Sequence, residues 1–238
     1  MRVRKRIRLL MGVIFSLLLT GMITGGSVQA ADKKVAKVAL GGAHSAAIAT
    51  DGSLWMWGSN ESGALGNGKK GNDLCEGTPI KVLDNVVSVS LSTGSTYDAH
   101  SGAVTRDGSL YMWGCNSSGQ LGDGTTTDQL KPKKVLTGVS QVVLGHRKTA
   151  AIKTDGSLWV CGSNENNGLG ANGNQKKFVK ILDDVVQVDF GSSHGAALKR
   201  DGSIWMWGND TNGQLCGING SPKKLEGMTD VKQISLGH

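Results

Sequence analysis

Three histidine and aspartate pairs recur along the chain at a constant spacing, and both residue types can transfer protons or bind a metal ion. The pairs are His44 with Asp51, His100 with Asp107, and His194 with Asp201, seven residues apart in each case. The pattern occurs four times in all, and its third occurrence has Lys148 in place of the histidine. Because the pairs belong to successive repeats, we expect them to lie apart rather than to converge on one substrate or metal ion.

The sequence contains none of the local motifs that supply a complete catalytic or cofactor site. It has no nucleophile elbow, phosphate-binding glycine loop, HExxH zinc motif or paired CxxC. A histidine at the start of a strand commonly hydrogen-bonds neighbouring backbone, and we expect this structural role here. We therefore predict no catalytic residue, no cofactor and no metal site, and a protein that is not an enzyme.

The histidines mark the first strand of a β-hairpin that occurs four times. The second half of the motif reads DGSLWMWG from Asp51, DGSLYMWG from Asp107, DGSLWVCG from Asp155 and DGSIWMWG from Asp201. Asp-Gly between two apolar runs is a strong hairpin signal. We expect a type I′ turn at each of these positions, with positive φ at both the aspartate and the glycine.

Two further elements complete each repeat. A glycine-rich loop places one leucine at the same offset, at Leu65, Leu121, Leu169 and Leu215, and we expect these side chains to enter the core. Runs rich in valine, isoleucine and leucine follow and predict strands. Four strands per unit and a period of about 50 residues indicate an all-β fold, a β-propeller of four-stranded blades. All six tryptophans fall in one strand of the repeat, so we expect buried core residues rather than a binding platform.

The pattern of a histidine, a DGS(L/I)W hairpin and a GQLG-type loop closely resembles the repeat of the regulator of chromosome condensation family. The resemblance extends from about Val35 to His238. It implies a propeller of about seven blades, each of about 50 residues, that serves as a protein-interaction platform. The exchange-factor activity of the eukaryotic namesake is not carried over, because no individual residue here matches it. The family also has a secreted bacterial member that inhibits β-lactamases, but this chain is similar to it only in its expected fold and export.

The first 30 residues predict a secretory signal peptide. They carry five basic residues, an apolar run from Leu9 to about Thr20, and the small-residue exit Val28-Gln29-Ala30. An uncleaved membrane anchor is the alternative, but threonine and glycine interrupt the apolar run early. Cleavage after Ala30 lowers the formal charge from +7 to +2, which removes most of the case for nucleic acid as a partner. We expect a secreted protein of the extracellular space or cell envelope, with no stable membrane span after cleavage.

The length departs from the pattern of the family. Residues 31–238 hold four repeats, which we assign to blades at about 35–85, 86–138, 139–185 and 186–231, with the start of a fifth at 232–238. A ring of seven blades would need about 350 residues. The sequence therefore predicts an incomplete or open ring, whose terminal blades expose apolar faces and can self-associate.

Candidate binding residues occupy one recurring strand position and one loop. A lysine precedes an apolar residue at the same position of each repeat, at Lys81, Lys134, Lys180 and Lys224. These lysines either protect outer strand edges or capture an acidic partner such as an anionic wall polymer. The loops 68–78 and 92–98 are unique to their repeats, and the second contains Tyr97, a favoured interface residue, and Asp98.

The four cysteines, Cys75, Cys115, Cys161 and Cys216, occupy irregular positions in the repeat, so the fold does not require them. An even count in an exported chain permits disulfides in three pairings, and we favour free thiols. Taken together, the sequence predicts a secreted, non-enzymatic binding propeller whose partner is an extracellular or envelope protein. The alternatives are an inhibitor of an extracellular enzyme and a module that binds cell wall or carbohydrate.

Overall fold

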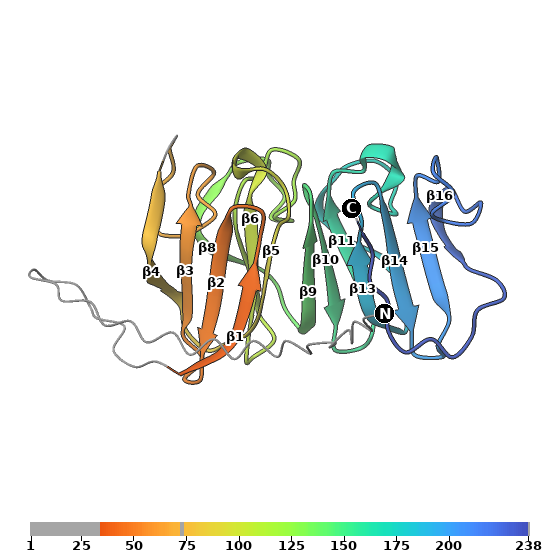
Figure 1. The fold of residues 1–238 in the computed structure, drawn as a ribbon, viewed down its shortest axis with the longest axis horizontal. Coiled ribbons are helices and arrows are strands. Elements are labelled where there is room, and N and C mark those ends of the chain that lie inside the picture. The colour runs from red at the N-terminus through yellow and green to blue at the C-terminus, as the bar shows by residue number, and fades with distance from the viewer. Residues whose placement is uncertain (1–33, 72–73, 238) are drawn as a thin grey trace, which may run out of the picture. The chain divides into compact units, whose positions relative to one another are not determined.

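The computed structural model describes residues 34–71 and 74–237, so the predicted signal peptide lies outside the described residues. The described part is all-β, with four antiparallel sheets of four strands, and each sheet uses four strands that are consecutive in the chain (Figure 1). This arrangement confirms the prediction of propeller blades.

The strands follow one pattern in every blade, and we number the blades in chain order. Blade 1 holds β1 (Val35–Leu40), β2 (His44–Ala49), β3 (Leu54–Ser59) and β4 (Cys75–Leu83). Blade 2 holds β5 (Val86–Leu91), β6 (His100–Thr105), β7 (Leu110–Gly114) and β8 (Gln129–Leu136). Blade 3 holds β9 (Val139–Gly145), β10 (Lys148–Lys153), β11 (Leu158–Gly162) and β12 (Gln175–Leu182). Blade 4 holds β13 (Val185–Phe190), β14 (His194–Lys199), β15 (Ile204–Gly208) and β16 (Gly220–Lys224).

Antiparallel pairing divides the connections of each blade between two ends of its sheet. The first and third strands of a blade run in the same direction. The connection from the first strand to the second and the connection from the third strand to the fourth therefore lie at the same end of the sheet, which we call the loop end. Two short 3-10 helices, η1 (Thr96–Asp98) and η2 (Glu165–Asn167), lie in loop-end connections. The four Asp-Gly turns lie at the opposite end, which we call the turn end.

The Asp-Gly turns form hairpins, but the prediction of type I′ turns is wrong. Gly52 has a positive φ of 83°, whereas the preceding Asp51 does not. Ala49 exchanges backbone hydrogen bonds around the turn, accepting from Gly52 N–H and donating to Ser53 O, each at 2.9 Å. The loop therefore contains three residues and ends in a left-handed glycine. The Asp51 carboxylate accepts hydrogen bonds from the N–H and the hydroxyl of Ser53, which accounts for the serine of the DGS motif.

Successive blades pack face to face through apolar clusters. One cluster joins blades 1 and 2, the next joins blades 2 and 3, and another joins blades 3 and 4. The loop leucines Leu65, Leu121, Leu169 and Leu215 are fully buried, which confirms their predicted role. Burying a leucine side chain contributes about 1.5–3 kcal/mol, so each loop is held firmly against its sheet.

The tryptophans fall into two groups, which corrects the expectation that all six are buried. Trp113 and Trp207 are fully buried, and their indole N–H groups donate to the preceding blade, at Ala64 O (2.7 Å) and Gly168 O (3.2 Å). The other four are only partly buried: Trp55, Trp57, Trp159 and Trp205. Trp57 occupies the same repeat position as the two buried residues, but it belongs to the first blade of the series.

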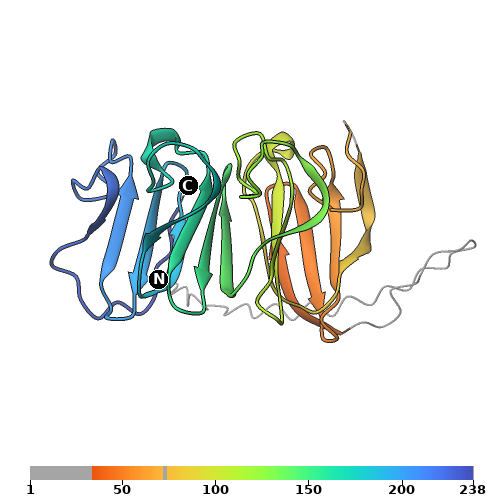
Figure 2. The same ribbon diagram turned by 180° about the vertical axis from the view of Figure 1, so that it is seen from behind.

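The four blades form an open series, seen from both sides in Figures 1 and 2. Within the described residues, no apolar cluster joins blade 1 to blade 4. The segment 232–237, where a fifth blade is predicted to start, lies along β13 without joining its ladder, because Ile234 N–H donates to Gln187 Oε1 and Leu236 N–H to Asp189 Oδ2. At the other end of the series, in blade 1, the side chain of Leu40 on β1 is 74% exposed.

Candidate functional site

The loop end carries the residues that depart most from the repeat. The first-to-second connection of blade 2, residues 92–99, is longer than its counterparts at 41–43 and 191–193. The corresponding connection of blade 3 bears His146 and Arg147, and Arg147 adopts a positive φ of 54° that most non-glycine residues avoid. Since both departures lie at the same end of neighbouring blades, they are placed to form one surface.

The two predicted loop residues occupy contrasting positions on this surface. Tyr97 is 66% exposed, although it is a large aromatic side chain. Asp98 points toward blade 3, where its Oδ2 atom accepts a hydrogen bond from Arg147 Nη2 (2.9 Å) and lies 3.3 Å from His146 Nε2. The Asp98 side chain is only 14% exposed. The loop is therefore anchored to the next blade through Asp98, which leaves Tyr97 presented to solvent on a fixed base.

Charge pairing sets the ionisation of this cluster. Burial by itself would raise the pKa of Asp98, but hydrogen bonds from Arg147 and His146 outweigh it and lower that pKa below its ordinary value. The hydrogen bond with the Asp98 carboxylate in turn raises the pKa of Arg147. Asp98 and Arg147 therefore form an ion pair at neutral pH, and this pair joins blades 2 and 3.

The recurrent histidines do not form acid–base pairs with the recurrent aspartates. Each histidine begins the second strand at the loop end, whereas its aspartate lies in the turn at the opposite end of that strand. His44 Nε2 instead hydrogen-bonds Ser101 Oγ (3.0 Å), and His100 Nε2 hydrogen-bonds Thr149 Oγ1 (3.2 Å). The histidines thus bind hydroxyls of the next blade, where we expected neighbouring backbone.

Burial keeps two of these histidines neutral. It lowers the pKa of His44 to about 4 and that of His100 to about 3. A group with such a pKa is neutral at physiological pH and has no exposed proton to exchange with a substrate. These side chains therefore act as links between blades.

The four predicted lysines occupy equivalent positions in the outer strands. Each one pairs with the first aromatic residue of the neighbouring strand: Lys81 with Trp55, Lys134 with Tyr111, Lys180 with Trp159 and Lys224 with Trp205. Two of them form ion pairs with the aspartate three residues later, Lys81 with Asp84 (2.8 Å) and Lys180 with Asp183 (2.6 Å). The structure does not bring these lysines to Tyr97 and Asp98, since they line the sides of the blades.

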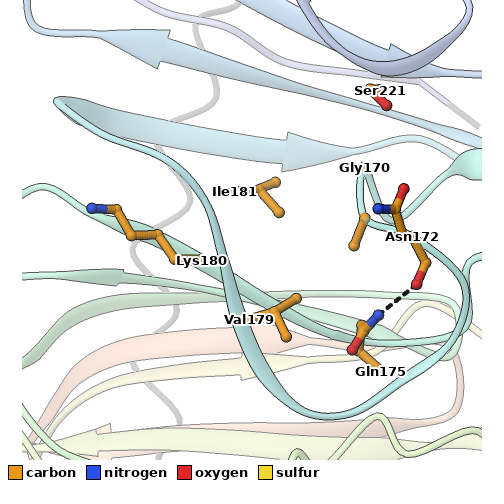
Figure 3. A pocket seen from close by; sticks show the side chains of 8 residues that line it. Gly170, Asn172, Gln175, Val179, Lys180, Ile181 and Ser221 are labelled. Carbon is orange, nitrogen blue, oxygen red and sulfur yellow. Dashed lines mark hydrogen bonds between the residues drawn. The ribbon is translucent and has the colours of Figure 1, made fainter.

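Shallow grooves separate the outer strands of neighbouring blades. The groove between blades 3 and 4 measures about 390 Å³, and β12 contributes Val179, Lys180 and Ile181 to its wall (Figure 3). At its rim, Gln175 Nε2 donates to Asn172 O at 2.6 Å. One lysine among apolar and amide side chains suits contact with an extended surface better than it suits chemistry on a small molecule.

All four cysteines are free thiols, with Cys75 and Cys216 exposed and Cys115 and Cys161 buried. Within residues 34–71 and 74–237, no cluster of three or more histidine, cysteine, aspartate or glutamate side chains is arranged to hold a metal ion. No helix in this part of the chain is long and apolar enough to cross a membrane.

Sequence reasoning missed the contribution of blade 3 to this surface. His146 and Arg147 lie almost 50 positions from Asp98, and only the packing of adjacent blades brings them together. One signal was available: Lys148 stands at the histidine position of the repeat, directly after these two residues.

Comparison with known proteins gives consistent matches over the repeats. A family model described as "Regulator of chromosome condensation (RCC1) repeat" matches residues 51–97, 107–152 and 155–198. A second model of the same description matches residues 35–64, 87–120 and 185–214.

Two curated proteins illustrate the sequence similarity. The ultraviolet-B receptor UVR8 of Arabidopsis thaliana is 35% identical over 130 residues, which is 52% of this chain and 29% of the receptor. The human E3 ubiquitin-protein ligase HERC2 is 40% identical over 116 residues, which is 48% of this chain and 2% of the ligase. The chain thus spans less than a third of either relative.

Solved structures share the fold over most of the chain. Prp20p from Saccharomyces cerevisiae superimposes with a TM-score of 0.70 at 19% identity, covering 84% of this chain and 52% of Prp20p. Human WBSCR16 superimposes with a TM-score of 0.67 at 24% identity, covering 81% of this chain and 53% of that protein. The described blades therefore correspond to about half of each of these propellers.

Proposed function

Because the chain belongs to the regulator of chromosome condensation (RCC1) repeat family, we propose that it is a secreted, non-enzymatic scaffold that binds another protein through its loop end. The observation that carries this proposal is the anchoring of Tyr97 beside the ion pair of Asp98 and Arg147. An exposed aromatic side chain on a rigid base is typical of interface anchors, since little conformational entropy is lost when it binds.

Three further observations support this proposal. Prp20p, which is yeast RCC1, binds Gsp1p and histones and has a solved structure with bound Kap60, so a propeller of similar fold has protein partners. Two of the recurrent histidines, His44 and His100, are buried links between blades, which favours binding over catalysis. The proposal of secretion rests on the basic and apolar pattern of residues 1–30.

Affinity capture tests the proposal. Immobilised protein is exposed to culture medium and envelope extract of the source organism, and retained proteins are compared between the wild type and Tyr97→Ser. The matched control is Lys134→Gln, an exposed change on the side of blade 2. We expect one or a few proteins that are retained by the wild type and the control but lost with Tyr97→Ser. Equal retention by all three variants would contradict a loop-end interface.

The identity of a retained protein also tests a narrower alternative. An inhibitor of an extracellular enzyme is the same scaffold with an enzyme as its partner. If the retained protein is an enzyme, its activity is measured with and without a molar excess of the propeller. Loss of activity that depends on Tyr97 supports inhibition, and unchanged activity supports a scaffold.

The regular placement of the outer lysines favours a second candidate, the binding of an anionic wall polymer. Lys134 and Lys224 are exposed and occupy the same register in β8 and β16. Binding to a polyanion such as dextran sulfate would weaken steeply with salt and with Lys134→Gln plus Lys224→Gln. Retention on dextran sulfate that is unaffected by this double change would dismiss the polymer hypothesis.

A further inference from the structure

A small hollow opens at the loop end between blades 3 and 4, next to the cluster of Asp98 and Arg147. Its volume is about 180 Å³, and Arg147, Lys148, Ser163, Glu165 and Ser192 contribute to its lining. Sites for complete small-molecule ligands usually measure about 300–1,000 Å³. The hollow is therefore suited to a single side chain rather than to a nucleotide or a sugar chain.

Lys148 is at this hollow because two neighbouring repeats depart from the pattern together. In the first two blades, the histidine at this position bonds a hydroxyl of the next blade, Ser101 or Thr149. The equivalent residue of blade 4 is Gly195, which offers no hydroxyl. Lys148 Nζ donates instead to Ser192 O, at 2.8 Å, and lies 5.3 Å from the centre of the Phe190 ring.

The ammonium group of Lys148 is buried but incompletely paired. The residue is 3% exposed, and its hydrogen bond to Ser192 O uses one of three donors. No carboxylate lies within ion-pair distance of Nζ among the described residues. Burial accordingly lowers the pKa of Lys148 to about 8, so the group is mostly charged at neutral pH and would be stabilised by an anion.

Arg147 supplies a second set of donors beside the lysine. Its Nη2 atom is bonded to Asp98, but its buried Nε atom has no hydrogen-bond partner among the described residues. The acidic groups near the hollow have different roles. Asp98 is held by Arg147 and His146. The exposed Glu165 belongs to the lining of the hollow, and its charge raises the pKa of Lys148 against the larger, opposite effect of burial.

We propose that this hollow binds the carboxylate of an aspartate or glutamate side chain of the protein partner. The inference rests on the proposed function and names the chemistry that the partner presents. The carboxylate would accept hydrogen bonds from Lys148 and from the hydroxyls of Ser163 and Ser192, and Glu165 would have to turn away. Tyr97 presents an aromatic contact next to the same cluster, which favours an acidic peptide segment over an isolated anion.

Fluorescence anisotropy with a labelled octaglutamate peptide tests the inference on the full chain. Lys148→His introduces the residue of the other three repeats and removes the ammonium group. Because Gly195 offers that histidine no hydroxyl, the exposed change Glu165→Gln serves as a second variant. With Lys148→His we expect binding to weaken by about tenfold or more, because a charge-assisted hydrogen bond to the carboxylate is lost. Glu165→Gln removes the competing carboxylate, and we expect it to tighten binding by about threefold.

Two controls make the result decisive. Lys199→Gln removes a lysine at the turn end and should leave affinity unchanged, and an octaglutamine peptide should not bind. Competition by inorganic phosphate distinguishes a general anion site from a carboxylate site on a peptide: displacement at low millimolar phosphate would favour the free anion and overturn the peptide assignment. Equal affinity of Lys148→His and wild type, or no tightening with Glu165→Gln, would overturn the inference as a whole.

Failure of this inference can be separated from failure of the proposed function. If partner capture still depends on Tyr97 while octaglutamate binding does not depend on Lys148, the scaffold function stands and the carboxylate site is rejected. If neither dependence is observed, both are rejected.

Discussion

The stability of the blades should decrease between pH 7 and pH 5 because two histidines are buried in their neutral form. Burial lowers the pKa of His44 to about 4 and that of His100 to about 3, against 6.5 for the unperturbed group. Between pH 7 and pH 5 the unfolded chain takes up protons on both residues, while the folded chain does not. The free energy of unfolding therefore falls by about 2 kcal/mol for each histidine, or about 4 kcal/mol for the pair.

Urea denaturation at pH 5, 6 and 7, followed by circular dichroism, measures this change. The variants His44→Gln and His100→Gln should be less stable than the wild type at pH 7, but each should lose about 2 kcal/mol less on going to pH 5. His146→Gln, at an exposed position, controls for the removal of a histidine from the chain. A wild-type stability that is the same at pH 5 and pH 7 would refute the assignment of buried neutral histidines.

The remaining predictions concern packing, backbone conformation and thiol reactivity. Trp113→Phe removes the indole bond to the preceding blade and should cost about 1–3 kcal/mol in urea denaturation, whereas Trp57→Phe, at a half-exposed position, should cost less. Gly114→Ala should lower stability by at least about 1–2 kcal/mol, because φ is 98° and an added Cβ would lie 2.6 Å from Ala99 O; a neutral effect would contradict that geometry. In the native protein, Ellman's reagent should modify two thiols rapidly and the other two only after unfolding, since burial also raises the pKa of the Cys161 thiol. The reactive pair should be Cys75 and Cys216, and rapid modification of all four would contradict the buried positions.

The sequence was sufficient to predict the blades because their signals are local. Asp-Gly turns and the repeated leucines each depend on a few adjacent residues, and Leu65 and its equivalents are buried as expected. The type of turn was mistaken for a local reason as well. Asp51 keeps a negative φ because its carboxylate is held by Ser53, so only Gly52 enters the left-handed region.

The candidate site was predicted only in part because it depends on contacts between blades. The loop with Tyr97 and Asp98 could be recognised as unique to its repeat. The partners of Asp98 could not, since Arg147 belongs to the next blade and reaches it only after the sheets pack. Contacts between blades also explain why the two tryptophans differ in burial. Trp113 is buried against the preceding blade, whereas Trp57 has the same sequence context but lies in the first blade of the series and is only partly buried.

Site-specific photo-crosslinking tests the central claim, that the loop end binds a protein, most directly. Benzoylphenylalanine is placed at position 97, or at position 134 on the side of blade 2, and the protein is irradiated in culture medium and envelope extract. We predict one discrete adduct from position 97 that unlabelled wild type suppresses and Tyr97→Ser does not, and no such adduct from position 134. A specific adduct from position 134 with none from position 97 would contradict the claim.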